Sequence, residues 1–173
     1  LITNGTTLTE QNTRTLVDTG LDRIWVSIDG ATPETYADVR IGAELPKIIE
    51  NVWRLARMRK GGHFPQPEIG IAFLAMQRNI ADLPQIIRIA RRVGAKHLSV
   101  SNLQPATQEM QADRLYTHTM RNIAYLPAPH LPHISLPKMD FDEATRDALI
   151  ETFNSGWNVS FAGNNWGGAN DVC

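Results

Sequence analysis

Residues 68–76 read EIGIAFLAM, and this stretch decides the fold of the sequence. After its glutamate the stretch has no polar side chain, and its length is typical of a β-strand rather than of a helix. A strand that is apolar on both faces is expected in a parallel sheet whose two faces are covered. We therefore expect residues 68–76 to form a central strand.

Strand and helix patterns alternate on the amino-terminal side of this strand. Residues 1–3 and 23–28 are expected to be strands. Between them, Thr9 is expected to cap a helix that ends at Gly20, where a left-handed residue is needed. Residues 32–34 (TPE) follow the second strand and are expected to lie in a loop.

The alternation continues through residue 102. An apolar helical stripe precedes the central strand, and Gly61-Gly62 is expected to end that helix. Asp82 should cap a further helix that ends at Gly94, and residues 97–102 (HLSVSN) should form the next strand. The stripe consists of Ile48, Ile49, Val52, Leu55 and Ala56. Four strands with helical crossovers predict an α/β fold with parallel strands and right-handed connections.

The pattern breaks after residue 103. An irregular helix is expected around residues 115–125, and residues 126–137, with four prolines, are expected to form an extended connector. A last helix is expected over residues 142–153. Residues 158–161 (NVSF) are expected to form a short strand before a loop rich in glycine and asparagine.

The composition limits the size and the partners of the protein. A chain of 173 residues can bury one ordinary core, so we expect one domain and a tail. The formal net charge of −1 gives no field that would hold nucleic acid or an anionic membrane. Because no stretch has the roughly 20 apolar residues that span a bilayer, and no signal peptide is evident, a cytoplasmic location is expected.

The chain has a single cysteine, Cys173. One cysteine permits no internal disulfide, and it cannot form a cluster of thiolates by itself. The first residue, Leu1, is not a methionine and falls in what reads as the middle of a strand. We therefore expect the chain to be a fragment of a longer protein.

The carboxyl ends of the expected strands carry polar side chains. In open α/β sheets and β/α barrels this edge binds ligands, because the loops there vary while the sheet holds them in place. The residues that this rule selects are Thr3, Asn4, Ser27, Asp29, Asn79, Ser99, Ser101 and Asn102.

Alternation along the strands sorts these residues by face. Ile24, Val26 and Ile28 are expected to meet the helices, which places Ser27 and Asp29 on the inward face near the mouth of a barrel. The same rule places Ser99 and Ser101 inside. Such polar groups need hydrogen-bond partners. A nucleoside-sized ligand would supply them, and so would bonds among the side chains and buried water.

Several segments together resemble a known family. They are I-T-N-G (2–5), V-S-I-D-G-A-T-P-E-T-Y (26–36) followed by Arg40, M-Q-R-N (76–79) and S-V-S-N-L (99–103). In order and spacing the series resembles radical S-adenosylmethionine (SAM) enzymes of the group with a carboxyl-terminal SPASM or related auxiliary-cluster domain. The resemblance rests on the series of motifs rather than on any one of them.

The resemblance implies an architecture. The family has a partial, TIM-like barrel of six β/α units, of which residues 1–105 would form the later part. Residues 106–157 would be the end of the barrel and a linker. Residues 158–173 would begin the SPASM-like region, with Cys173 as a metal ligand of an auxiliary iron–sulfur cluster.

The resemblance also implies cofactors and roles. In the family, three cysteines in a CxxxCxxC loop hold a 4Fe-4S cluster that cleaves SAM reductively to a 5'-deoxyadenosyl radical. Asn4 would lie by the active site, Ser27 and Asp29 would contact the ribose and methionine parts of SAM, and Asn102 would meet the adenine. Arg40 would pair with the methionine carboxylate, for which a planar guanidinium is suited, or it is a solvated loop residue. Asn79 is a turn or capping residue more readily than a ligand.

The chain departs from the family pattern, because neither the CxxxCxxC loop nor the glycine-rich second strand that receives the SAM amino group is in the sequence. Alone it is expected to be inactive. The resemblance implies an intact parent that modifies a peptide, protein or cofactor precursor, including maturases associated with tungsten-containing oxidoreductases. It also implies an electron donor such as flavodoxin or ferredoxin.

Two alternatives remain open. The chain is a non-catalytic binding or scaffold module that docks a partner at an exposed strand edge, or it is another β/α-barrel enzyme that uses Asp29 as an acid or base.

Weaker candidate sites are a metal at His130 and His133, a general base at His97, and substrate contacts from Glu109, Met110 and Tyr116. Gly167-Gly168 lacks the strand-to-helix context of a phosphate loop.

Overall fold

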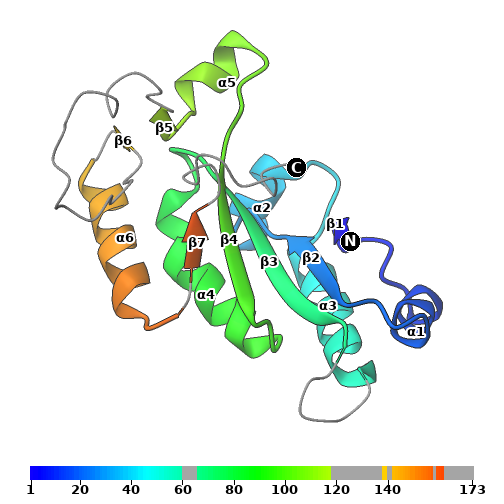
Figure 1. Ribbon diagram of the computed structural model, residues 1–173. Helices are drawn as coiled ribbons and strands as arrows, with labels where there is room; N and C mark the ends of the chain where they lie inside the picture. The colour runs from blue at the N-terminus through cyan, green and yellow to red at the C-terminus, as the bar shows by residue number, and fades with distance from the viewer. Residues whose placement is uncertain (60–65, 118–137, 140–141, 158, 162–173) are drawn as a thin grey trace, which may run out of the picture.

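The computed structural model describes residues 1–59, 66–117, 138–139, 142–157 and 159–161. These residues form a parallel sheet of five strands, with β3 in the middle (Figure 1). The order is β1 (Ile2–Thr3), β2 (Arg23–Ser27), β3 (Glu68–Ala75), β4 (His97–Asn102) and β7 (Val159–Phe161). The predicted central strand and the parallel α/β class are confirmed.

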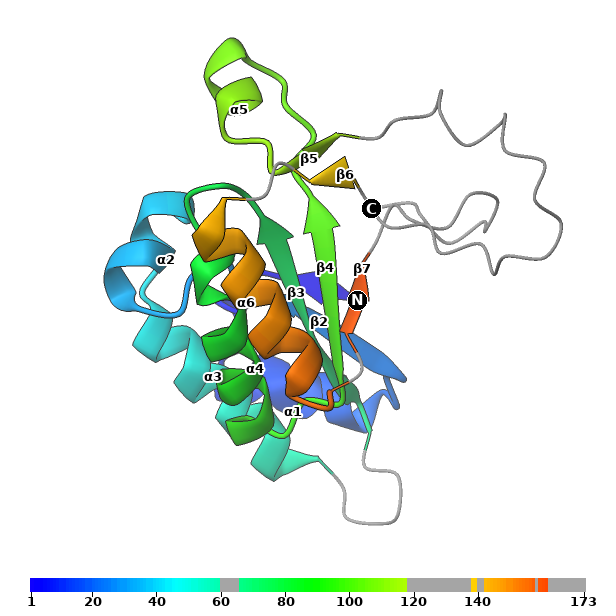
Figure 2. The ribbon, with the colours of Figure 1, turned by 90° about the vertical axis from the view of Figure 1, so that its left-hand side faces the viewer.

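The long helices cover one face of this sheet (Figure 2). They are α1 (Glu10–Asp18), α3 (Leu45–Met58), α4 (Leu83–Arg92) and α6 (Glu143–Asn154). In a doubly wound sheet, helices would lie on both faces. A strand order that follows the chain, with all of these helices on one side, is instead the arrangement of a β/α-barrel segment.

The hydrophobic core lies between the sheet and this helix layer. Alternate residues of the three longest strands point into it and are fully buried, as the alternation of side chains along a strand requires. They are Ile24, Val26, Ile69, Ile71, Phe73, Leu98 and Val100. The predicted aliphatic face of residues 24, 26 and 28 is therefore confirmed.

The other face of β3 differs from the prediction. Ala72 and Leu74 are only half-buried there, so in the described part of the chain one face of β3 is covered by helices and the other is partly open. Gly70 is buried on the open face because the Trp25 ring lies over it; a Cβ at residue 70 would be 2.4 Å from Trp25 Cε3. The apolar run thus reflects small residues under a tryptophan as well as core packing.

The residues predicted at the ends of α1 and after α4 lie where the sequence places them. The Thr9 hydroxyl accepts a hydrogen bond from Asn12 N at 3.2 Å, and Gly20 and Gly94 adopt φ values of 69° and 70° at helix ends. Helix α3 ends at Met58, before Gly61-Gly62, which lie outside the described residues.

Three predictions of secondary structure need correction. Residues 32–34 begin a helix, α2 (Pro33–Val39), whose amino end is closed by a capping box between Thr32 and Thr35. Residues 115–117 are not helical: α5 (Gln108–Ala112) precedes β5 (Tyr116–Thr117), which pairs antiparallel with β6 (Lys138–Met139). Asp82 is the N-cap residue of α4, as predicted, but its side chain makes no cap bond to that helix, and it also ends a 3-10 turn, η1 (Ile80–Asp82).

The remaining predictions fall near the carboxyl end. The last predicted helix is confirmed as α6, with Asp142 Oδ1 accepting from Thr145 N at 2.7 Å. The short strand is confirmed as β7, and it joins the sheet beside β4, so the sheet extends beyond residue 105. The extended connector predicted at 126–137 lies outside the described residues.

Candidate functional site at the carboxyl edge of the sheet

Asn4 and Thr3 lie where β1 ends at the carboxyl edge. Asn4 is exposed, and its Oδ1 accepts hydrogen bonds from Thr6 N at 3.1 Å and from Thr6 Oγ1 at 2.7 Å, which closes a local turn. Buried Asn51 of α3 fixes this turn from below, because its side chain donates to Gly5 O at 2.9 Å. These hydrogen bonds therefore hold the turn at the edge, while Asn4 is exposed to solvent.

Three hydroxyls line the open face near the same edge. Ser27 of β2 and Ser99 and Ser101 of β4 are half-buried, and within the described ranges their hydroxyls have no hydrogen-bond partner. Asn102, also half-buried, ends β4 opposite Ala75 of β3. The structure thus brings polar side chains from β2 and β4, the two parallel strands that flank β3, to one rim, where a polar ligand could contact them.

Asp29 lies just beyond β2 and is 1% exposed. Ile28 N donates to Ala72 O at 2.9 Å, and the next amide of β3 that faces β2, Leu74 N, donates to Asp29 Oδ1 at 2.7 Å. The Asp29 side chain thus takes the place of a main-chain carbonyl in the ladder. Its other oxygen, Oδ2, accepts from Arg40 Nε at 2.6 Å and forms an ion pair with the same guanidinium.

Arg40 follows α2, and its side chain is 35% exposed. The structure therefore joins two predicted site residues to each other, with Asp29 buried and one edge of Arg40 open to solvent. In this arrangement Asp29 orients Arg40 and binds the edge of β3. Contact of either residue with SAM stays a prediction.

Asn79 organises the loop that follows β3. It is buried, its Oδ1 accepts from Met76 N at 2.8 Å, and its Nδ2 donates to Leu74 O at 2.8 Å and to Asp29 O at 3.0 Å. With its amide bonded to three main-chain groups, Asn79 acts as a turn residue. Its link to Asp29 spans 50 residues, and no local pattern in the sequence indicates it.

Gly30 is required by the close approach of α2. A Cβ at this position would lie 2.3 Å from Tyr36 N and 2.5 Å from Thr35 C, both main-chain atoms. Tyr36 itself is fully buried, and its pKa is raised, chiefly by burial, with a smaller raising effect from Asp29 and an opposing one from Arg40. Asp29, Gly30 and Tyr36 of the 26–36 motif thus have structural roles.

A second cluster of charges lies at the opposite, amino end of the strands. Glu68 accepts hydrogen bonds from Arg23 Nε and Nη2 at 3.0 and 2.6 Å, and its Oε2 lies 3.1 Å from His97 Nε2. The centroid of the His97 ring lies 6.0 Å from the centroid of the Trp25 ring. His97 therefore has a structural environment, far from the carboxyl edge, and not the surroundings of a general base at the candidate site.

This cluster predicts an acid-dependent loss of stability. The pKa of Glu68 is lowered below its ordinary value of 4.5, first by the bonds from Arg23 and then by His97. A carboxyl whose pKa falls on folding stabilises the protein above its unfolded pKa and loses that contribution as the pH falls through the folded pKa. We expect the free energy of unfolding to fall below pH 4.5, and Glu68→Gln to flatten that fall.

Because the Glu68 side chain is 36% exposed, the free energy of unfolding that the wild type loses on acidification should exceed the loss in Glu68→Gln by less than about 1 kcal/mol. Urea unfolding at pH values between about 3 and 6 measures it. Glu143→Gln, at an exposed carboxyl, is the matched control and should follow the wild-type curve. A Glu68→Gln curve that parallels the wild type below pH 4.5 would contradict the assignment.

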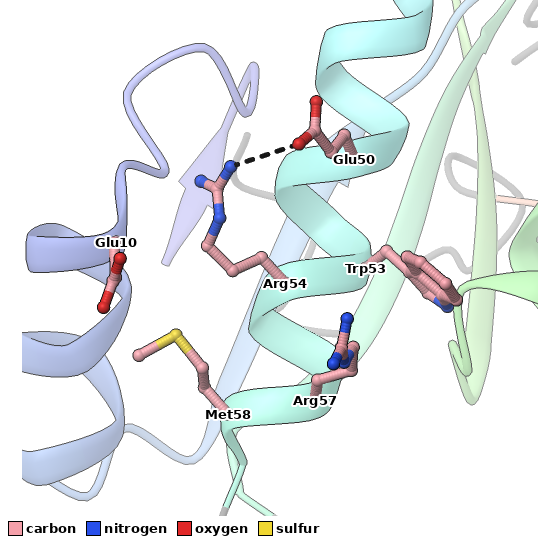
Figure 3. Close-up of a pocket in the computed structure, with 6 residues that line it drawn as sticks. All are labelled: Glu10, Glu50, Trp53, Arg54, Arg57 and Met58. Atoms are coloured by element: carbon pink, nitrogen blue, oxygen red, sulfur yellow. Dashed lines mark ion pairs between the residues drawn. The ribbon is translucent and has the colours of Figure 1, made fainter.

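A pocket of about 470 Å³ lies in the helix layer rather than at the carboxyl edge (Figure 3). It is bordered by α1 and α3, where Arg54 pairs with Glu50 at 3.7 Å and Arg57 lies 5.5 Å from the centre of the Trp53 ring. The Arg54 side chain also donates to Leu8 O at 3.0 Å, which fixes the start of α1. Because no predicted site residue borders this pocket, it is not the candidate site.

Glu109 lies on α5, where its pKa is lowered by its own main-chain amide and by Thr107, and it is exposed together with the start of that helix. Cys173, His130, His133 and Gly167-Gly168 lie outside the described residues.

Within the described ranges no group of three or more His, Cys, Asp or Glu side chains is placed to hold a metal ion. No helix in these ranges is long and apolar enough to cross a bilayer.

The fold and this rim define a β/α-barrel segment with a polar carboxyl edge, and comparisons with known proteins agree with that class. The chain is 27% identical over 155 residues to the tungsten-containing aldehyde ferredoxin oxidoreductase cofactor-modifying protein of Pyrococcus furiosus. The matched region covers 82% of this chain and 43% of that protein. The chain is also 32% identical over 111 residues to a probable GTP 3',8-cyclase of Methanocaldococcus jannaschii, and this match covers 64% of the chain and 35% of the cyclase. No protein-family model matches the chain.

A solved structure shares the fold. The crystal structure of a radical SAM methyltransferase from Sphaerobacter thermophilus matches 94% of this chain and 40% of its own chain, with a TM-score of 0.52 and 11% sequence identity. Together the relatives and this structure support the radical SAM superfamily for the chain. The chain spans less than half the length of each of these proteins.

Proposed function

We propose that this chain is the SAM-binding part of a radical SAM enzyme that cleaves SAM reductively to a 5'-deoxyadenosyl radical and acts on a peptide, protein or cofactor precursor. The observation that carries the proposal is the rim of polar side chains at the carboxyl edge of a sheet whose fold matches a radical SAM methyltransferase. The relative in cofactor modification supports the same class of chemistry.

The residues present fit one of the two implied cofactors. The hydroxyls of Ser27, Ser99 and Ser101 lie half-buried on the open face without protein partners in the described ranges, and the exposed edge of Arg40 is a donor suited to a carboxylate. SAM offers ribose hydroxyls and a carboxylate to such groups. In the proposal Ser27, Asn102 and Asn4 border SAM, and Asp29 acts by orienting Arg40.

The residues present do not fit the 4Fe-4S cluster. Such a cluster needs at least three thiolates, and the sequence has one cysteine, Cys173. In the proposal the cluster that binds SAM is therefore held by cysteines outside this sequence. Cys173 as a ligand of an auxiliary SPASM-type cluster, a flavodoxin or ferredoxin as electron donor, and a cytoplasmic location belong to the same proposal.

Anaerobic reconstitution of the complete natural protein with iron and sulfide tests the proposal. After addition of SAM and dithionite we expect 5'-deoxyadenosine, measured by liquid chromatography. A protein that takes up iron and sulfide yet forms no 5'-deoxyadenosine would overturn it.

The position of Ser27 at the rim predicts that its hydroxyl contributes to the affinity for SAM. Ser27→Ala in the complete protein should raise the Kd for SAM about three- to tenfold, the loss of one hydrogen bond. Isothermal titration calorimetry measures the Kd. Thr15→Ala removes an exposed hydroxyl from α1 and is the matched control, for which the Kd should not change. Equal Kd values for Ser27→Ala and the wild type would remove Ser27 from the rim.

A further inference from the structure

Arg78, in the loop after β3, bonds to two elements that are far from it in the sequence. Its Nε donates to Asp113 Oδ2 at 2.6 Å, and its main-chain N donates to Asp113 Oδ1 at 3.2 Å. Its Nη1 donates to Asp38 Oδ2 at 3.1 Å. Asp38 lies on α2 and Asp113 follows α5, so a single guanidinium joins the connections that follow β2, β3 and β4.

The segment that Arg78 holds lies at the candidate site. We call residues 103–115 the rim segment; they follow Asn102 directly and include α5. Figures 1 and 2 show α5 beyond the carboxyl ends of β3 and β4. Leu103 and Leu115, at the two ends of the segment, are buried, whereas α5 between them has no buried residue. The segment is therefore anchored at its ends and only weakly packed between them.

Contacts near the carboxyl end of the rim segment decide its position. Gln77 N donates to Asp113 O at 3.0 Å, and Met76 forms an isolated antiparallel bridge with Arg114. The Asp113 side chain is 9% exposed, whereas the Asp38 side chain is 59% exposed. A buried carboxylate depends strongly on its partner, while an exposed ion pair contributes little. The Arg78–Asp113 contact should therefore dominate over the Arg78–Asp38 contact.

We propose that Arg78 is a positioning residue that holds the rim segment against the carboxyl edge of the sheet, so that the segment covers the rim at which SAM would bind. The part of this inference that concerns SAM rests on the proposed function; the part that concerns Arg78 and the rim segment does not. The guanidinium suits the role because its planar fork reaches two carboxylates at once, which a lysine does not.

Hydrogen–deuterium exchange of the complete protein, with and without SAM, tests the inference. In Arg78→Gln and in Asp113→Asn we expect exchange across residues 107–115 to rise about tenfold, with exchange in α1 and α3 unchanged. Arg78→Lys should give an intermediate rise. Asp38→Asn is the matched control and should change exchange less than about twofold. SAM should slow exchange of the rim segment in the wild type and much less in Arg78→Gln.

The outcomes separate the two proposals. Faster exchange in the variants together with no SAM binding by the wild type would keep the role of Arg78 and overturn the proposed function. SAM binding by the wild type together with exchange within about twofold of wild type in both Arg78→Gln and Asp113→Asn would overturn the role of Arg78. Should Arg78→Gln fail to fold, Asp113→Asn and Arg78→Lys carry the test by themselves.

Discussion

Asp29→Ala is expected to lower the free energy of unfolding by about 2–4 kcal/mol. The substitution removes the acceptor of Leu74 N, which is then left without its partner at the edge of β3. It also removes the partner of Arg40. Because the Arg40 side chain is 35% exposed, water can replace part of that lost contact, which keeps the expected value below the upper range for buried ion pairs. Urea unfolding monitored by circular dichroism measures the change.

Asp29→Asn separates the two roles of the carboxylate. The asparagine carbonyl can still accept from Leu74 N, whereas its amide group cannot pair with the Arg40 guanidinium. It should therefore cost less than Asp29→Ala. Asp147→Asn, which alters an exposed ion pair on α6, is the matched control and should change stability by less than about 0.5 kcal/mol. A cost for Asp29→Ala no larger than that of Asp147→Asn would show that the carboxylate does not hold the edge of β3.

The strands and most helices follow from local patterns, which is why the sequence predicts them. The continuous apolar run gives β3, the helical stripe gives α3, and Gly20 and Gly94 end their helices. Helix α2 is not predictable in the same way, because its seven residues are too few to show a stripe. Its signals are Thr32 and Pro33, which also occur in turns.

The position of Asp29 shows where the alternation rule stops. Alternation correctly separates Ser27 from Val26, because both lie within β2. Asp29 lies two residues beyond the end of the strand, where side chains no longer alternate strictly between the faces. Its carboxylate instead extends along the ladder to β3. Polar residues at the carboxyl edge are therefore predictable as a group, but the sequence alone does not tell ligand-facing residues from structural ones.

Three contacts that the sequence does not predict join distant parts of the chain. Asn79 binds the main chain at Asp29, Asp82 accepts from Ala31 N at 2.8 Å, and Arg78 binds Asp113. The side chains of Asn79, Asp82 and Arg78 are ordinary polar groups in the connection that follows β3, and only the parallel sheet brings this connection next to its distant partners. The resemblance to radical SAM enzymes includes residues 76–79, yet these residues have structural contacts that the resemblance does not indicate.

Gly30→Ala is expected to cost about 3 kcal/mol or more in the free energy of unfolding, at the upper end for overpacking. The added Cβ would meet main-chain atoms of Thr35 and Tyr36 at 2.5 and 2.3 Å, and main-chain atoms cannot rotate aside as a flexible side chain can. Helix α2 would have to move away from β2. That movement would pull Tyr36 out of the core and separate Arg40 from Asp29, so under the proposed function SAM binding should weaken together with stability.

Gly20→Ala is the matched control for this prediction. Gly20 has φ +69°, and a Cβ added there would have no atom within 4 Å, so alanine meets only the left-handed backbone cost of about 1–2 kcal/mol. Gly30 has no such backbone demand, so any larger loss at Gly30 must come from steric contact with α2. Thermal and urea unfolding of both variants measure the difference. A smaller loss for Gly30→Ala than for Gly20→Ala would mean that α2 does not rest on residue 30, and the position of Arg40 would need another explanation.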